Sequence, residues 1–458
     1  MLNPALDRDV FNNRANAALK ISMLEGALHA VMVGVAESYL GAFAVELGHS
    51  PRRLALLATF PLLVGAGCQL ISPLLCAWLG SRKRVAVAGA LGQTASLGAL
   101  LAIAVTENGS LTALLMAKMC FWVSGGAMAP AWNAWMAHLT LHTERARYFA
   151  VRSAFNHVAL LVAFGAAGWA LQASGMHVLR CFVTLFFIAF TARLASALAL
   201  LMQADLELVL PIHPRDAGLL PRLGRALVRG RLRVAVYGAT LAFGTQLSAP
   251  FFTPYMLREL ALDYKSFSLL SALSILAKAL VFPCCPAVAR QVGLRTLLRW
   301  AGIGVAMIPL IWAMTSRFEA LVFAHLLGGA AWAAVEYASF QLMLDSAPDG
   351  LTTEFFSLTN AFTGVAQVAG ALCGGLLLGQ PGIGYAQIFL ISALLRVLPL
   401  IVLVLVLRPE HFPRPLRELY TRLWSVRPLA GAEPRPLLAG SEVPRALGNR
   451  TTDPPPAL

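Results

Sequence analysis

Ionisable side chains occur inside several long apolar stretches of this sequence. Glu336 lies in the stretch 319–344, Glu37 in 21–46 and Lys118 in 111–137. If these stretches cross a bilayer, each charge costs roughly 3 kcal/mol at the membrane centre unless it is paired or faces water. Such residues are therefore candidates for holding a polar solute or carrying a proton. The alternative is that they only bridge packed helices.

These charges share helical faces with aromatic and amide side chains. His325, Trp332 and Glu336 follow one stripe of a helix, and Lys118, Trp122 and Asn133 form a comparable stripe. Other polar residues lie near the middle of further apolar stretches, where an amide can bind solute or bridge helices. The substrate or coupling candidates are Glu37, Lys118, Trp122, Asn133, Gln246, Lys278, His325, Trp332 and Glu336.

The chain contains the same unit twice. The segments Gly125-Gly126-Ala127 and Gly328-Gly329-Ala330 correspond at an offset of roughly 203 residues, and later pairs keep an offset of roughly 203 to 207. This offset places Glu336 on the neutral Asn133, so duplication does not impose its charge. Lys278 stands at the repeat position of Gly65, and we expect either an anion or counter-ion role or a structural salt bridge. Earlier pairs are Pro73, Gly80 and Arg82 with Pro286, Gly293 and Arg295.

Composition identifies an integral membrane protein. Hydrophobic residues make up 58% of the 458 residues, charged residues only 13%, and the mean hydropathy is +0.70. A soluble domain has roughly 25% charged residues. The apolar residues form blocks of about 20 or more, which is long enough to cross a bilayer as a helix. We expect twelve spans: 21–46, 54–79, 84–106, 111–137, 147–172, 178–202, 233–257, 266–289, 296–315, 319–344, 354–379 and 385–407.

The net charge of +14 is distributed asymmetrically. Basic residues crowd the leader 1–20, alternate loops, the linker 203–232 and the tail 408–458, a positive-inside bias that places both termini in the cytoplasm. This placement argues against a nucleic-acid partner. The Pro- and Arg-rich tail cannot bury a core, so we expect it to be disordered. The leader precedes an apolar block too long for a cleavable signal.

Signatures of enzymes and cofactors are missing from the sequence. It has no phosphate loop, no nucleophile elbow and no metal-binding cysteine or histidine motif. The seven cysteines fall inside apolar blocks, where a free cysteine behaves as a small hydrophobe. We therefore expect neither an enzyme nor a bound cofactor.

Twelve spans, two similar halves and a basic central linker resemble the major facilitator superfamily of secondary transporters over about residues 20 to 407. The loop after the second span keeps Gly80 and Arg82 of the family's motif, but Ala77 replaces its aspartate. The resemblance implies two pseudo-symmetric six-helix bundles, 21–202 and 233–407, around a central cavity lined by spans one, four, seven and ten. It also implies that the loops containing Gly80, Arg82, Gly293 and Arg295 take part in gating.

Further ionisable residues are interpreted with this fold in mind. Arg193 and Arg396 fall in peripheral spans, so we expect them to snorkel or to pair with linker or lipid. Glu25 and His29 are one turn apart and form either an interfacial pair or a proton relay. Arg152, with Arg145 and Arg147, is expected to orient the chain and to hydrogen-bond at the gate without touching substrate.

The function expected from this resemblance is secondary active transport by alternating access in the inner membrane. The aromatic lining favours a small organic, amphipathic solute. Glu37 or Glu336 is the candidate for proton coupling, and Glu37 is expected to pair with Lys118. The expected partners are this solute, protons and the lipid bilayer, and the protein is expected to be a monomer. The alternative is a non-transporting or lipid-handling relative that serves as an assembly or signalling platform, which the long tail favours.

Overall fold

The computed structural model describes residues 4–107, 109–140, 145–205, 219–227, 231–348 and 350–406. Within these ranges every regular element is a helix, which confirms the predicted all-α class. They belong to one compact unit, Met1–Pro413. The predicted tail 408–458 lies outside the described residues.

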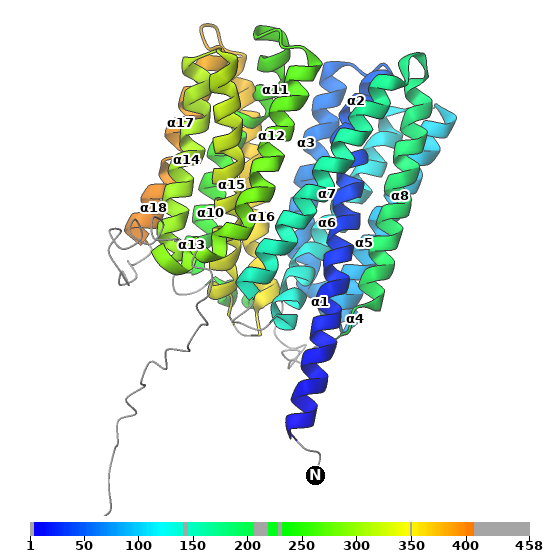
Figure 1. Cartoon of the computed structure of the whole chain (residues 1–458), viewed down its shortest axis with the longest axis vertical. Coiled ribbons are helices and arrows are strands. Elements are labelled where there is room, and N and C mark those ends of the chain that lie inside the picture. Colours follow the sequence, from blue (N-terminus) through cyan, green and yellow to red (C-terminus); the bar gives the residue numbers. More distant parts are fainter. Residues whose placement is uncertain are drawn as a thin grey trace, which may run out of the picture. The chain divides into compact units, whose positions relative to one another are not determined.

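Helices of the first half lie close to the expected spans (Figure 1). The helix of the first span already begins at Pro4, so the residues of the expected leader continue into the span as helix from that point. The elements are α1 (Pro4–Val35), η1 (Glu37–Tyr39), α2 (Leu40–Glu46), α3 (Pro51–Cys68), η2 (Gln69–Ile71), α4 (Ser72–Leu79), α5 (Arg82–Thr106), α6 (Leu111–Leu139), α7 (Arg145–Ala173), η3 (Gly175–His177) and α8 (Val178–Met202).

The second half repeats this order. A short helix, α9 (Leu219–Ala226), lies in the described part of the linker and contacts α16. The following elements are α10 (Arg231–Gln246), η4 (Ala249–Phe251), α11 (Phe252–Pro254), η5 (Tyr255–Glu259), α12 (Tyr264–Val281), η6 (Phe282–Cys284), α13 (Cys285–Val292), α14 (Leu294–Met314), α15 (Phe318–Ser346), α16 (Thr352–Leu378), α17 (Tyr385–Leu395) and α18 (Leu398–Val406).

Eleven helical segments among the described residues are long and apolar enough to cross a membrane. The remaining expected span, 233–257, is broken into α10, η4, α11 and the π-helix η5. Pro250 and Pro254 lie at these breaks, and each removes a backbone N–H donor that a continuous helix would use. The seventh span is therefore present as a chain of short helical pieces.

Breaks in the helices follow the internal repeat. The 3₁₀ turns η1 and η4 interrupt the first span of each half, and η2 and η6 interrupt the second. Each pair is offset by roughly 212 or 213 residues, as are Gly80 and Gly293. Short 3₁₀ stretches inside a helix are common at hinges. The duplication thus preserves where the helices bend as well as where they start and end.

Glycines at repeat positions bring two helices of each half together. A Cβ at Gly126 of α6 would clash with the backbone of Gly65 in α3. A Cβ at its mate Gly329 in α15 would clash with the backbone of Ser274 in α12. Small residues allow this close approach between membrane helices, where no hydrophobic driving force pulls them together.

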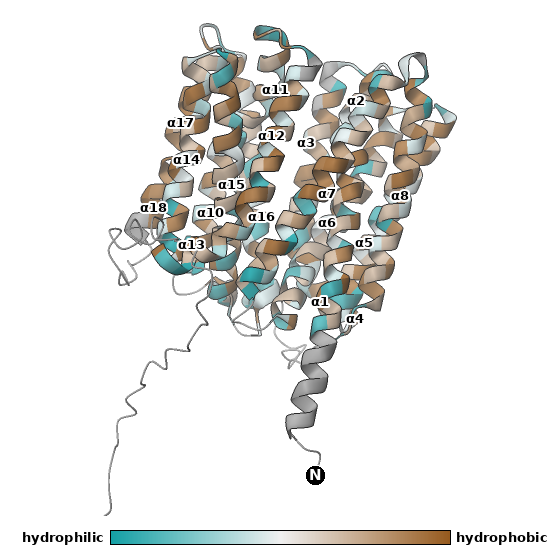
Figure 2. Cartoon of the chain, viewed as in Figure 1, coloured by the Kyte–Doolittle hydropathy of each residue, from teal (hydrophilic) through white to brown (hydrophobic). Residues whose placement is uncertain are grey.

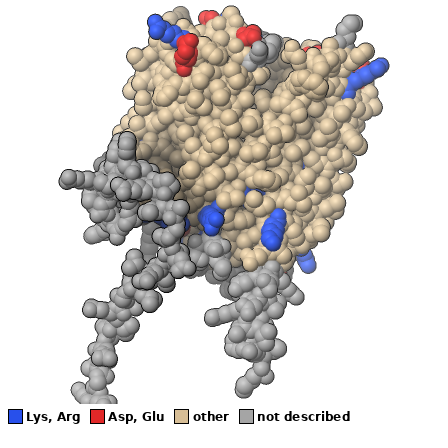
Figure 3. Space-filling view, viewed as in Figure 1, with Lys and Arg blue, Asp and Glu red and all other residues tan. Residues whose placement is uncertain are grey.

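On the outer face shown in Figure 3, charged side chains gather near the two ends of the unit. Figure 2 shows apolar residues along the middle of the helices, and Figure 3 shows a broad surface almost free of Lys, Arg, Asp and Glu between two charged edges. The end formed by the starts of α5, α7 and α16 is called the basic end here, because it carries Arg82, Lys83, Arg84, Arg145 and Arg147. The uncharged band matches the apolar core of a bilayer.

Candidate functional site: two cavities

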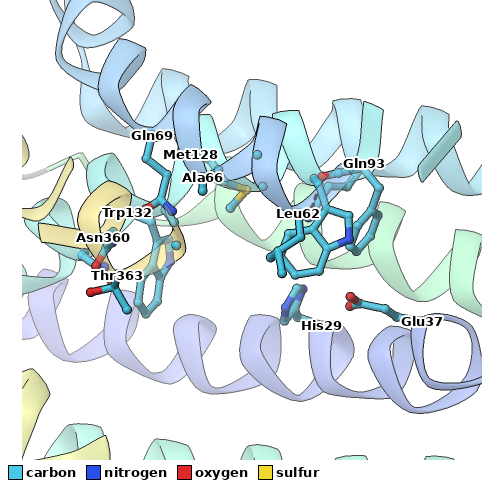
Figure 4. Close-up of a pocket in the computed structure, with 18 of the residues that line it drawn as sticks. His29, Glu37, Leu62, Ala66, Gln69, Gln93, Met128, Trp132, Asn360 and Thr363 are labelled. Carbon is cyan, nitrogen blue, oxygen red and sulfur yellow. Dashed lines mark hydrogen bonds between the residues drawn. The ribbon is translucent and has the colours of Figure 1, made fainter. Parts of the chain in front are cut away.

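A cavity of about 570 Å³ opens among the helices of the first half and is called the N-half cavity. Figure 4 shows His29 and Glu37 projecting from the first span toward Leu62 and Gln93, with Trp132 beside Asn360 and Thr363. The predicted residues Glu37, Trp122 and Asn133 line this cavity. It is lined as well by Glu25, Arg152 and Arg193, which the sequence analysis had placed away from the substrate.

A second cavity of about 540 Å³, the C-half cavity, lies among α10, α12, α15 and α16. Four predicted residues line it: Gln246, Lys278, Trp332 and Glu336. Residues of spans one and four thus line the first cavity, and residues of spans seven and ten line the second. The first cavity also includes residues of α16 from the second half, so the two cavities adjoin where the halves meet.

Helix α16 contributes to both cavities. Asn360, Thr363 and Gln367 line the N-half cavity and the C-half cavity alike. Their spacing of three and four residues puts them on one helical face. Sequence reasoning missed them because the resemblance pointed to spans one, four, seven and ten, although this polar stripe is visible in the sequence.

Glu336 and Lys278 form an ion pair between α15 and α12. Their side chains are 40% and 21% exposed, so the pair is in contact with the space of the C-half cavity. Of the two roles considered for Lys278, the structure shows the salt bridge. Because it is accessible, the pair can separate at a lower cost than one fully buried in protein.

Glu37 and Lys118 line one small cavity at the opposite side of the N-half from the basic end. Their charges interact electrostatically, but the structure has no direct ion pair between them. The expected contact is therefore not formed here. The two side chains face a shared space that separates them.

Glu25 is the centre of a buried charge cluster that joins three helices. Its carboxylate accepts a hydrogen bond from Arg152 Nη2 of α7 at 2.7 Å and lies 3.7 Å from Arg193 Nη1 of α8. Ser196 Oγ accepts from Arg193 and donates to Glu25 at 3.3 Å. Arg152 also stacks on Trp132, with its guanidinium carbon 4.5 Å from the ring centroid.

The expectation that Arg193 and Arg396 snorkel to the membrane surface is wrong. Their exposures are 1% and 2%. Arg396 donates to the carbonyls of Val305 and Thr245 and to Ser248 Oγ. The Nη atoms of each guanidinium bond to protein groups inside its own half, while the Nε of each has no partner among the residues that the structure describes. These contacts hold both side chains inside the protein. Glu25 pairs with Arg152 and Arg193, while His29 Nδ1 has no hydrogen-bond partner in the described part of the chain, so the interfacial pair of Glu25 with His29 is not formed and the proton relay stays a hypothesis.

The remaining predicted residues lie outside the two cavities described above. His325 packs against Trp312, with ring centroids 5.6 Å apart. At the basic end, Gly80 ends α4 and Arg82 donates from Nε to Thr353 Oγ1 of α16 at 3.0 Å, which joins the two halves. Gly293 and Arg295 lie at the start of α14, the equivalent place in the second half. Among the described residues, no three His, Cys, Asp or Glu side chains gather as a metal site requires.

Sequence comparison gives a family for this architecture. A profile of the Major Facilitator Superfamily matches residues 234–439, which include α10 to α18. Over these residues the chain matches the major facilitator superfamily. No curated protein sequence gives a significant match.

Solved structures of this superfamily share the fold over most of the chain. A bacterial homologue of the iron transporter ferroportin matches with a TM-score of 0.64 and 15% identity, covering 84% of this chain and 98% of its own. The human organic anion transporter MFSD10 gives 0.63 and 16%, covering 86% and 99%. The E. coli fucose:proton symporter FucP gives 0.68 and 13%, covering 85% and 99%. The matched family and these structures support a multi-pass membrane protein with a transporter fold.

Proposed function

We propose that this protein is a secondary active transporter that moves a small organic, amphipathic solute by alternating access, driven by protons. The observation that carries the proposal is the accessible ion pair between Lys278 and Glu336 in the C-half cavity. An accessible carboxylate can exchange a proton with water, and a cation beside it makes the two protonation states differ in contact and charge.

The cavity linings support an organic solute with an apolar body. Trp122 and Trp132 line one cavity and Trp332 the other, with amide groups from Asn133, Gln246 and α16 between them. Apolar and aromatic walls with a few polar groups are typical of sites for small organic molecules. The similar structures of a fucose:proton symporter and of an organic anion transporter are consistent with cargo of this size.

Contacts at the basic end support alternating access. Arg82 bonds to Thr353, Phe149 packs against Phe340 with centroids 4.8 Å apart, and Arg222 of α9 pairs with Glu354. The first two of these contacts join the two halves at the basic end, and the third joins the linker helix to α16. Because they are polar or aromatic contacts between separate helices, they can be exchanged for contacts at the other end when the halves rock.

In this proposal, proton coupling follows because a proton and the ammonium group of Lys278 compete for the carboxylate of Glu336. A proton on this carboxylate removes its attraction to Lys278 and frees the ammonium group for other partners in the cavity. The contact between α12 and α15 therefore differs between the protonated and the ionised protein. A proton gradient can bias the transporter only through such a difference between states.

A transport assay with Glu336→Gln tests this proposal. Purified protein is first screened by thermal shift for stabilising organic solutes, and uptake is then measured in proteoliposomes with an imposed proton gradient. Glu336→Gln keeps the shape but cannot ionise, so we expect uphill accumulation to be lost while solute exchange without a gradient continues. Glu46→Gln, which removes an exposed carboxylate at the end of α2, is the control and should accumulate solute normally. Undiminished uphill uptake by Glu336→Gln would show that coupling runs elsewhere, with Glu37 as the next candidate.

A further inference from the structure

The charge cluster in the N-half cavity contains one carboxylate and two guanidinium groups. Glu25, Arg152 and Arg193 all line the cavity, and their side chains are 5%, 13% and 1% exposed. Arginine stays protonated in proteins, so a single ionised Glu25 leaves one positive charge without a balancing partner. Leaving a buried charge without a balancing partner is costly, and such residues in membrane segments usually have a function.

Among the residues that the structure describes, Glu25 is the acidic side chain that pairs with these two arginines. Glu37 lies twelve residues further along the first span, or roughly 18 Å at 1.5 Å per residue, and interacts with Lys118. His29, which lies between Glu25 and Glu37 on α1, faces Arg152 and Arg193. The groups that face the cluster from α1, α7 and α8 therefore add no second negative charge.

Donors without a protein partner surround the same space. Among the described residues that line the cavity, Arg193 Nε, Trp122 Nε1 and Trp132 Nε1 are buried and have no hydrogen-bond acceptor in the protein. Indole and guanidinium N–H groups can only donate. A buried donor is normally paired, so several unpaired donors beside an excess cation fit a ligand that brings acceptor oxygens and negative charge.

The repeat positions in the second half lack the pair of cavity-lining arginines found in the N-half. The offset of 207 residues that relates Phe149 to Phe356 places the neutral Thr359 at the position of Arg152. Arg396, the mate of Arg193, bonds through its Nη atoms to two carbonyls and to Ser248, has an Nε that is unpaired within the described residues, and does not line the C-half cavity. Duplication therefore does not impose a cavity with two arginines.

We propose that Arg152 and Arg193 form an anion subsite that binds the carboxylate of an aromatic or aliphatic organic acid, whose apolar body lies against Trp122 and Trp132. Glu25 competes with this carboxylate for the two guanidinium groups and holds them in place when the subsite is empty. This subsite rests on the proposed transport function, and its substrates would be monocarboxylates.

Binding in detergent tests the subsite without any need for transport. Full-length protein is titrated calorimetrically with 4-phenylbutyrate, its amide 4-phenylbutyramide and its amine 4-phenylbutylamine, which share one apolar body. Loss of a charge-assisted hydrogen bond weakens affinity by about tenfold, so the carboxylate should bind about tenfold more tightly than the amide. The amine should bind more weakly still, because the proposed subsite has two guanidinium groups beside one carboxylate.

Two variants should shift this affinity in opposite directions. Arg152→Gln removes one cation, and we expect carboxylate affinity to fall by about tenfold. Glu25→Gln removes the internal competitor, and we expect it to rise by about tenfold, with little change for the amide. A purely structural cluster would weaken binding of both probes in both variants. Arg396→Gln, which changes the equivalent arginine outside the cavities, is the control and should not alter the preference for carboxylate.

The outcomes separate this inference from the proposed transport. Equal affinity for carboxylate and amide in wild type and in Glu25→Gln, or no binding of either, would overturn the anion subsite. Carboxylate binding that follows the two variants without gradient-driven uptake would uphold the subsite and contradict only proton-driven transport. Uptake of neutral solutes with no preference for carboxylates would contradict only the subsite.

Discussion

Arg193 and Arg396 occupy equivalent positions 203 residues apart, and both are buried, but only Arg193 meets a carboxylate. Arg396 is held by backbone carbonyls and a serine hydroxyl. The arginine of the ancestral unit was thus kept in both halves while its surroundings diverged. In the second half it packs helices together, and in the first it lines a cavity.

Helix α16 approaches α3 closely at Gly364. A Cβ there would clash with Ala66, whereas a Cβ at Gly375 of the same helix meets nothing within 4 Å. We expect Gly364→Ala to destabilise the protein by about 1–3 kcal/mol, because the helices must separate. Gly375→Ala should be neutral or stabilising by up to about 1 kcal/mol, since alanine favours helix. Melting temperatures of the two purified variants check this, and equal shifts would contradict it.

The ion pair between Arg222 and Glu354 joins the linker helix α9 to the start of α16. Removing it with Glu354→Gln should favour opening of the basic end. The buried Ser357, replaced by cysteine in a background without the seven native cysteines, reports this as faster alkylation. A contribution of about 1.4 kcal/mol corresponds to a tenfold faster rate. Glu319→Gln, at the first turn of α15, is the control, and an equal increase there would argue against a specific lock.

The pair between Lys278 and Glu336 should show coupling in a double-mutant cycle. Lys278→Ala leaves a carboxylate beside α12 with no counter-ion, while the double variant with Glu336→Ala leaves neither charge. Because both side chains are partly exposed, we expect a coupling free energy of only about 1 kcal/mol. Equilibrium unfolding in SDS and detergent mixtures measures it. Strict additivity would mean that the pair adds nothing to stability.

The distribution of basic residues predicts the orientation in the membrane. Reporter fusions in the linker 203–232 and at Leu458 should both indicate the cytoplasm, because Lys and Arg are retained on that side. The measurement compares alkaline phosphatase and green fluorescent protein fused at the same positions. A periplasmic signal from either position would contradict twelve spans.

Span positions could be predicted from sequence because hydropathy and the internal repeat report them independently. The breaks were harder to predict. Pro250 and Pro254 gave a signal for the broken seventh span, but η1 contains no proline and depends on how its neighbours pack. Local sequence does not specify such a turn when tertiary contacts decide it.

Candidate residues could be assigned to helical faces but not to partners. The stripe of Glu336 indicated the cavity side of α15, yet its partner Lys278 is 58 residues away on another helix. Arg193 was expected at the lipid surface because Glu25, which makes its burial possible, lies in the first span. Periodicity defines which way a side chain points, and only the packed fold defines what it meets.

The shared face of α16 ties the two cavities into one thermodynamic system. The side chains of Asn360, Thr363 and Gln367 can adopt only one set of hydrogen bonds at a time. A solute in the N-half cavity that binds them therefore changes how they can bind a solute in the C-half cavity. Linkage requires this influence to be reciprocal, with each occupant changing the affinity of the other by the same factor. Two solutes bound against this shared face of α16 would then bind cooperatively or antagonistically.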